Sequence, residues 1–109
     1  MKKYGITMTE KIIHIEVSKR KEKKYMVIVK DLITKKERKI HFGARNYQQF
    51  KDSTKLKKYS KKNHNDKERK RRYYLRFSGV ENKRKAVKKE LKKSKGKYNA
   101  KILSHIYLW

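Results

Sequence analysis

The sequence predicts a small α+β domain in which a three-stranded antiparallel sheet is followed by two or three helices. Three apolar runs with strand-like spacing precede Gly43. After Gly43, residues that favour helix N-caps stand before segments in which apolar residues recur at helical spacing. A length of 109 residues is typical of one domain. We therefore predict a single domain over residues 1–109, with a β-meander at 1–43 and a basic, mainly helical half at 44–109.

The first two strands are expected on either side of a charged turn at 19–24. Residues 11–17 place three apolar side chains on one face and His14 and Glu16 on the other; the apolar three are Ile13, Ile15 and Val17. Residues 25–29 are apolar on both faces. This second segment is therefore the predicted central strand.

The third strand is expected to end at Gly43. Its alternating residues are Arg38, Ile40 and Phe42 on one face, with Lys39 and His41 on the other. The intervening residues 31–36 form a loop, in which the side chains of Asp and Thr can bond nearby backbone.

Asn46 is predicted to cap a short helix that carries Tyr47 and Phe50 on one face. Residues 51–62 are rich in lysine, with only Leu56 and Tyr59 available for burial. This second segment is expected to form a loop or a weak helix.

A clearer helix is predicted from Lys67 to about Phe77, capped by Asn65 or Asp66 and ended by Gly79. Its spacing gives an apolar strip of Tyr73, Tyr74 and Phe77. A different face carries three arginines: Arg69, Arg72 and Arg76.

The remaining chain predicts a helix at 82–94, which buries Val87 and Leu91 and is broken at Gly96, followed by an apolar tail at 100–109. The tail is expected either to pack against the sheet or to insert into a partner. Its sheet contacts would be Val27, Val29, Ile40 and Phe42. The candidate docking residues are Ile102, Leu103, Ile106, Tyr107, Leu108 and Trp109.

The net charge is +26, from 36 basic and 10 acidic residues. Residues 44–109 hold 23 of the basic and 5 of the acidic residues, against 13 and 5 in residues 1–43. High charge with low hydrophobicity is typical of disorder, but 8 Tyr, 3 Phe and 1 Trp favour an ordered core with mobile basic segments. Self-repulsion at this charge favours an anionic partner.

Between Lys51 and Arg72, 11 of 22 residues are Lys or Arg. Such a cluster binds phosphates with salt-sensitive, sequence-tolerant affinity. An excess of 28 Lys over 8 Arg favours point-charge contacts over base reading. A solvated face, or an import signal at 67–72, are the alternatives. The candidate anion-binding residues are Lys57, Lys58, Lys61, Lys62, Lys67, Arg69, Lys70, Arg71, Arg72 and Arg76.

No catalytic residue, metal ligand, cofactor or small-molecule substrate is predicted. Cysteine is absent, which excludes thiolate chemistry and disulfides. Residues 63–66 superficially resemble a nuclease His-Asn-His box, but the second metal-binding His of that box is missing, so a turn with a helix cap is the preferred interpretation. His14 and His41 are expected to face solvent, and His105 to be packed or hydrogen-bonded. No apolar run reaches the ~18 residues of a membrane span, and no signal-peptide core follows Gly5.

Residues 39–44, Lys-Ile-His-Phe-Gly-Ala, followed by Tyr47, resemble a block in a family of small, basic proteins of nucleocytoplasmic large DNA viruses, of the algal-virus and giant-virus kind. The pattern continues with His-x-Asp, a basic helix ending in Tyr-x-x-Arg, and a C-terminal Leu-Trp. Its counterparts here are His64 and Asp66, residues 69–73 with Arg76, and Ser104 with Leu108 and Trp109. The similarity covers residues 24–82 and the last ten. The sequence departs from it at Phe77, where the pattern has His, and in the extra basic residues 55–62.

The resemblance brings no established activity and implies a viral setting. We expect a non-enzymatic structural protein of a large DNA virus particle, in the virion interior or on the inner capsid face, which binds capsid proteins or packaged DNA. The alternatives are a sequence-nonspecific DNA-condensing protein or a ribosomal-type RNA-binding protein, located in the host cytoplasm or nucleus.

Overall fold

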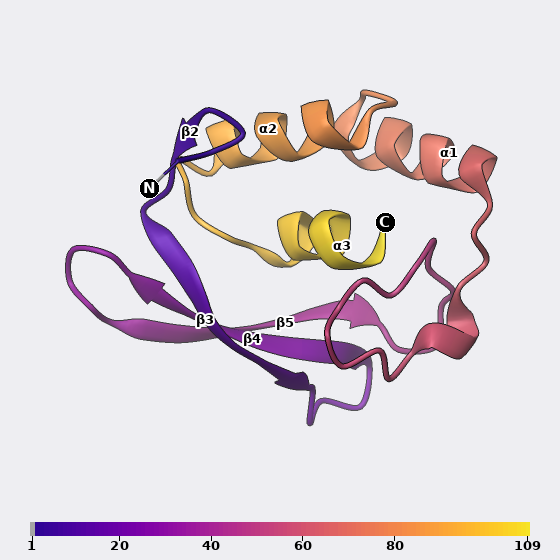
Figure 1. Cartoon of the computed structure of the whole chain (residues 1–109), viewed down its shortest axis with the longest axis horizontal. Coiled ribbons are helices and arrows are strands. Elements are labelled where there is room, and N and C mark those ends of the chain that lie inside the picture. Colours follow the sequence, from indigo (N-terminus) through magenta and orange to yellow (C-terminus); the bar gives the residue numbers. More distant parts are fainter. Residues whose placement is uncertain (1) are drawn as a thin grey trace.

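A computed structural model describes residues 2–109 and has the predicted α+β architecture (Figure 1). A two-stranded hairpin, β1 (Lys2–Lys3) and β2 (Ile6–Thr7), precedes a three-stranded antiparallel sheet. The sheet consists of β3 (Glu10–Val17), β4 (Lys23–Asp31) and β5 (Glu37–Ala44) in the order β3-β4-β5. A 3-10 turn, η1 (Ser60–Lys62), and three helices follow: α1 (Lys67–Ser78), α2 (Lys83–Lys93) and α3 (Ala100–Leu108).

The prediction of β4 as the central strand is confirmed. Val27 pairs with Ile15 on one side and with Ile40 on the other, and all three side chains are buried. The predicted charged turn is too long, however, because β4 already begins at Lys23 and Lys24 is buried.

The predicted buried face of β3 is wrong in part. The register shifts between Ile12 and His14, as at a β-bulge, and a bulge interrupts the alternation of side chains along a strand. Ile13 is therefore 41% exposed, whereas Ile15 is buried. Val17, the last residue of this edge strand, is also 36% exposed.

The helices cover one side of the sheet in two levels (Figure 1). α1 and α2 follow one another in a line, and α3 lies between that line and the sheet. The cap prediction for α1 is confirmed, since Asp66 accepts hydrogen bonds from the backbone of Glu68 and Arg69. Asn82, expected as the first residue of the next helix, caps α2 by accepting from the backbone of Lys85. α3 is capped in the same way by Asn99.

The apolar tail completes the core of its own chain, which is the first of the two predicted alternatives. Ile102, Leu103 and Leu108 are buried in one cluster with the four predicted sheet residues. The sheet and the other helices cover these three predicted docking residues, so their side chains are not exposed to a partner in this chain. Only Ile106, Tyr107 and Trp109 of that set are partly exposed.

The helix predicted after Asn46 is absent, and residues 45–63 form an irregular loop with η1 near its end. The buried carboxylate of Asp52 holds this loop, since it accepts hydrogen bonds from the Tyr25 hydroxyl, from the backbone and hydroxyl of Thr54, and from the Tyr59 backbone. Such side-chain acceptors satisfy backbone donors that a helix would otherwise use. Tyr47 is consequently 73% exposed instead of packed on a helix face.

Candidate nucleic-acid interface

A cleft of about 970 Å³ opens between α1, α3 and the end of the sheet where β4 begins and β5 finishes. We call it the basic cleft. It is lined by six cationic side chains and four aromatic ones, and no acidic residue lines it. The cationic residues are Lys23, Lys24, Arg69, Arg72, Arg76 and Lys101. The aromatic residues are Tyr47, Tyr73, Phe77 and Trp109.

Helical spacing brings the three predicted arginines of α1 to the cleft. Arg69, Arg72 and Arg76 stand three and four residues apart, so they occupy one side of the helix. Arg69 donates a hydrogen bond of 2.8 Å to the side-chain oxygen of Gln48. Within residues 2–109, Arg72 and Arg76 form no ion pair with an acidic side chain, so their charges are available to an anion.

A stack of aromatic rings forms one wall of the cleft. The rings of Tyr73 and Trp109 are parallel, with centroids 4.1 Å apart and an interplanar angle of 3°. The Phe77 ring lies next to that of Tyr73, tilted from it by 48°, with the two centroids 4.8 Å apart. Phe77 is 45% exposed, and the Arg76 guanidinium lies 5.6 Å from its ring centre.

Lys24 is buried at the cleft, with only 1% of its surface exposed. Its Nζ donates a 2.7 Å hydrogen bond to the backbone carbonyl of Tyr47. Burial, reinforced by the nearby charge of Lys62 and opposed by that of Asp52, lowers the pKa of Lys24 to about 8. The ammonium is therefore charged at neutral pH without a carboxylate in contact, and an anion in the cleft would stabilise it.

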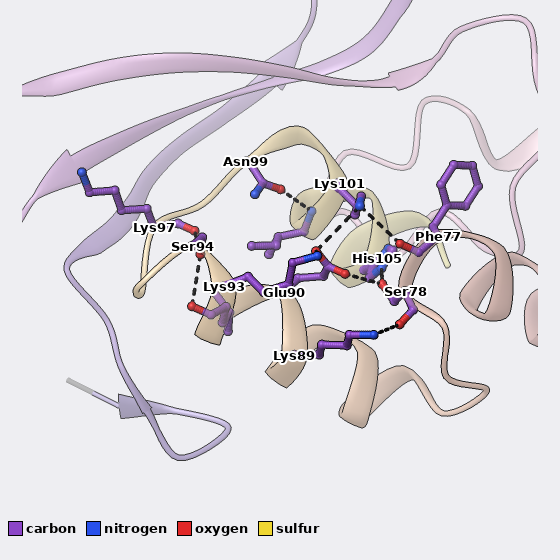
Figure 2. Close-up of polar contacts among 12 residues, drawn as sticks. Phe77, Ser78, Lys89, Glu90, Lys93, Ser94, Lys97, Asn99, Lys101 and His105 are labelled. Carbon is purple, nitrogen blue, oxygen red and sulfur yellow. Dashed lines mark hydrogen bonds and ion pairs between the residues drawn. The ribbon is translucent and has the colours of Figure 1, made fainter.

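A chain of hydrogen bonds fixes the cleft wall to the rest of the molecule, and Figure 2 shows its part around Ser78, Glu90 and His105. The Ser78 hydroxyl donates to Glu90 Oε2 at 2.8 Å, so its oxygen accepts from His105 Nε2, also at 2.8 Å. His105 Nδ1 is then the acceptor for the Tyr73 hydroxyl at 2.8 Å. Lys101, at the cleft, lies 3.7 Å from Glu90 and donates to the Phe77 carbonyl. These contacts join α1, α2 and α3 behind the aromatic wall.

His105 is neutral in this chain, because its burial lowers the pKa to about 4. Burial also raises the pKa of Tyr73, so its hydroxyl stays protonated and acts as a hydrogen-bond donor. The prediction that His105 is a packed, hydrogen-bonded residue is confirmed.

The other predicted anion-binding residues do not line the cleft. Arg71 pairs with Glu68 and Glu81. The Lys70 ammonium lies 4.6 Å from the centre of the Phe50 ring. The remaining residues lie on the loop, on η1 or at the start of α1: Lys57, Lys58, Lys61, Lys62 and Lys67.

Half of the cleft's cations were not among the predicted residues. Lys23 and Lys24 look like part of a charged turn in the sequence, and Lys101 like the polar face of the tail. Tyr47 was expected on one face of a short helix together with Phe50. No pattern in the sequence marks Lys23, Lys24 and Lys101 as members of one site, because they are brought together only by the fold.

The residues of the nuclease-like segment have local structural contacts. His64 Nδ1 accepts a hydrogen bond from the backbone N–H of Asp66, which caps α1. Across residues 2–109, no three His, Asp or Glu side chains are grouped so that they could hold a metal ion. Over the same residues, no helix has the length and apolar character to cross a bilayer.

Comparisons of the chain with protein-family models, with curated proteins and with solved structures find no match.

Proposed function

We propose that this protein binds nucleic acid without catalysing a reaction on it, and that the basic cleft makes the contacts with phosphates. The observation that carries the proposal is the meeting of six cations in one cleft whose lining has no acidic residue. Phosphates that meet such cations release condensed counterions, which gives affinity without sequence preference. The unpaired charges of Arg72 and Arg76 and the buried charge of Lys24 support this role.

The composition of the cleft also supports phosphate contact over simple solvation of charge. Three of the eight arginines of the chain line the cleft. A guanidinium binds phosphate through two parallel hydrogen bonds and stacks on flat rings. A solvated surface requires neither the burial of Lys24 nor the aromatic wall.

The test compares two double variants that remove the same charge. Arg72→Gln with Arg76→Gln changes the cleft, and Lys88→Gln with Lys92→Gln changes exposed residues of α2 outside it. Binding to labelled single-stranded and duplex DNA is measured by fluorescence anisotropy over a range of salt concentrations. We expect the cleft variant to lose about tenfold or more in affinity, and its slope of log affinity against log salt to fall by about 0.7–0.9 per lost phosphate contact. Equal losses in both variants would show that binding follows net charge alone and would contradict the proposal.

A structural role in a large DNA virus particle is the second candidate. The observation that favours it is that several residues of the pattern that resembles the viral family border the cleft, among them Tyr47, Arg69 and Trp109. The protein would then lie in the virion interior or on the inner capsid face, with the cleft on packaged DNA or on capsid carboxylates. The buried tail does not support this candidate, since Ile102, Leu103 and Leu108 are covered by their own chain. Detection of the protein in purified particles from which DNA has been removed tests the capsid contact.

A further inference from the structure

We propose that the ligand of the basic cleft is single-stranded nucleic acid, whose unpaired bases stack on Tyr47 and Phe77. This inference rests on the proposed function and names its substrate class. It starts from two exposed aromatic side chains at the cleft: Tyr47, 73% exposed, on the loop after β5, and Phe77, 45% exposed, on α1.

Folding does not account for the exposure of these rings. Burial of aromatic side chains is a main source of stability in a chain of this size, and Tyr25, Phe42 and Tyr74 are fully buried. The ring of Tyr47 is instead exposed to solvent, while its backbone carbonyl accepts a hydrogen bond from the Lys24 ammonium. The two exposed rings therefore lie in a cleft that is also lined by cations.

This combination fits a strand with unpaired bases. A base has a π-face that stacks on aromatic side chains whatever its identity, and the adjoining phosphates need cations along the same path. In a duplex the base faces are stacked on one another and only the edges are open. A flat ring inside a cleft therefore recognises an unpaired base and not a base pair.

The size of the cleft agrees with this ligand. A volume of about 970 Å³ lies at the upper end of the range for small-ligand pockets. It accommodates a few nucleotides, whereas a duplex would rest on its rim. Arg76 lies against the Phe77 ring, so a phosphate held by its guanidinium is placed next to a base on that ring.

The experiment separates bases from phosphates with three probes of equal length, about ten nucleotides, which is within the site sizes of single-strand-binding folds. The probes are a single-stranded oligothymidylate, an abasic oligonucleotide with the same phosphates, and a duplex. We expect the oligothymidylate to bind about tenfold or more tightly than either of the others. Equal binding of the abasic probe would overturn the inference, because affinity would then come from phosphates alone.

The variant Tyr47→Leu with Phe77→Leu removes the rings and keeps apolar side chains. Its matched control is Leu75→Ala, which alters an exposed apolar residue of α1 outside the cleft. We expect the double variant to bind oligothymidylate at least tenfold more weakly with an unchanged salt slope, and the control to bind as the wild type does. Wild-type affinity of this double variant would overturn the inference.

The outcomes distinguish this inference from the proposed function. If the double variants of the previous subsection behave as expected while single strand and duplex bind equally, nucleic-acid binding stands and single-strand recognition fails. If the cleft and α2 variants lose the same affinity, the proposed function itself fails. Polyglutamate that binds as tightly as oligothymidylate would overturn the inference and assign the cleft to an acidic protein surface.

Discussion

Lys24 has the most unusual environment among the cations of the chain. It is almost fully buried, and its only hydrogen-bond acceptor among the described residues is a backbone carbonyl. A buried ammonium without a carboxylate in contact lowers the stability of a fold. Residues that lower stability and line a cleft are candidates for a role in binding.

Replacing Lys24 by Met is expected to separate stability from binding. Because the pKa of Lys24 is lowered to about 8, the charged form that predominates at pH 7 is less stable in the folded state than in the unfolded state. We expect Lys24→Met to raise the free energy of unfolding at pH 7 by about 1–2 kcal/mol. The affinity for single-stranded DNA should fall about tenfold. Denaturant unfolding and anisotropy measure the two effects.

Lys83→Met is the matched control. Lys83 is half-buried, donates to the Ile106 carbonyl and has a pKa lowered by burial and by Lys70, but it lies outside the cleft. Its replacement removes the same charge and should leave the affinity unchanged. A Lys24→Met protein that binds as tightly as the Lys83→Met protein would show that Lys24 makes no contribution to the cleft.

The turn between α2 and α3 connects the helices to the N-terminal strands. Gly96 has φ +81°, and its carbonyl accepts hydrogen bonds from the Thr9 backbone (3.0 Å) and hydroxyl (3.2 Å). A Cβ added at Gly96 would lie 2.3 Å from the Thr7 carbonyl oxygen, which is backbone and cannot turn aside. Glycine is therefore required where this turn meets the hairpin.

Gly96→Ala is expected to reduce the free energy of unfolding by about 2–4 kcal/mol, from the positive φ and from the clash. Gly5→Ala is the control, because Gly5 has a similar φ of +78° and nothing within 4 Å of the added Cβ. It should lose only about 1 kcal/mol. Thermal or denaturant unfolding measures both. Equal losses would show that the approach of the turn to β2 does not constrain position 96.

Across the whole molecule, the most apolar helix occupies the centre. α3 packs on β5 and on α2, and α1 contacts α2. α3 also brings polar side chains into this centre, and the stability of the fold depends on their hydrogen bonds. The principal one is His105, which is fully buried and joins all three helices through Tyr73, Ser78 and Glu90.

The pKa of His105 predicts that acid weakens the fold. An unfolded histidine binds a proton with a pKa of about 6.5, but folded His105 does so only at about 4. Between these values the unfolded chain binds more protons, so stability falls as the pH is lowered. We expect His105 to account for a loss of about 2 kcal/mol between pH 7 and pH 5, measured by urea unfolding.

The His105→Gln variant should show a smaller loss over this range, whatever its stability at pH 7. Glu90 faces His105 and favours its protonation, whereas Lys83 and Lys101 oppose it. His41 and His64 also have lowered pKa values, but they titrate in both proteins and cancel in the comparison. An unchanged slope in His105→Gln would contradict the assigned protonation state.

The candidate site could be predicted only in part. Arg69, Arg72 and Arg76 followed from helical spacing, because residues three and four apart share a face wherever the helix lies. The role of Lys24 could not be predicted in this way, because its burial depends on the loop after β5, where the Tyr47 carbonyl accepts its hydrogen bond. Arg71 was indistinguishable from its neighbours in the sequence, yet Glu81, beyond the end of α1, pairs with it in the structure.

The sequence by itself determined the fold class, the central position of β4, the cap of α1 and the excess of positive charge. These features depend on local pattern and composition, which are set by residues that are close together in the sequence. Only the tertiary structure decided the bulge in β3, the loop around Asp52 and the burial of the tail in its own core. It also decided which residues line the basic cleft. Each of these depends on groups that are distant in the sequence and meet only when the sheet and helices have packed.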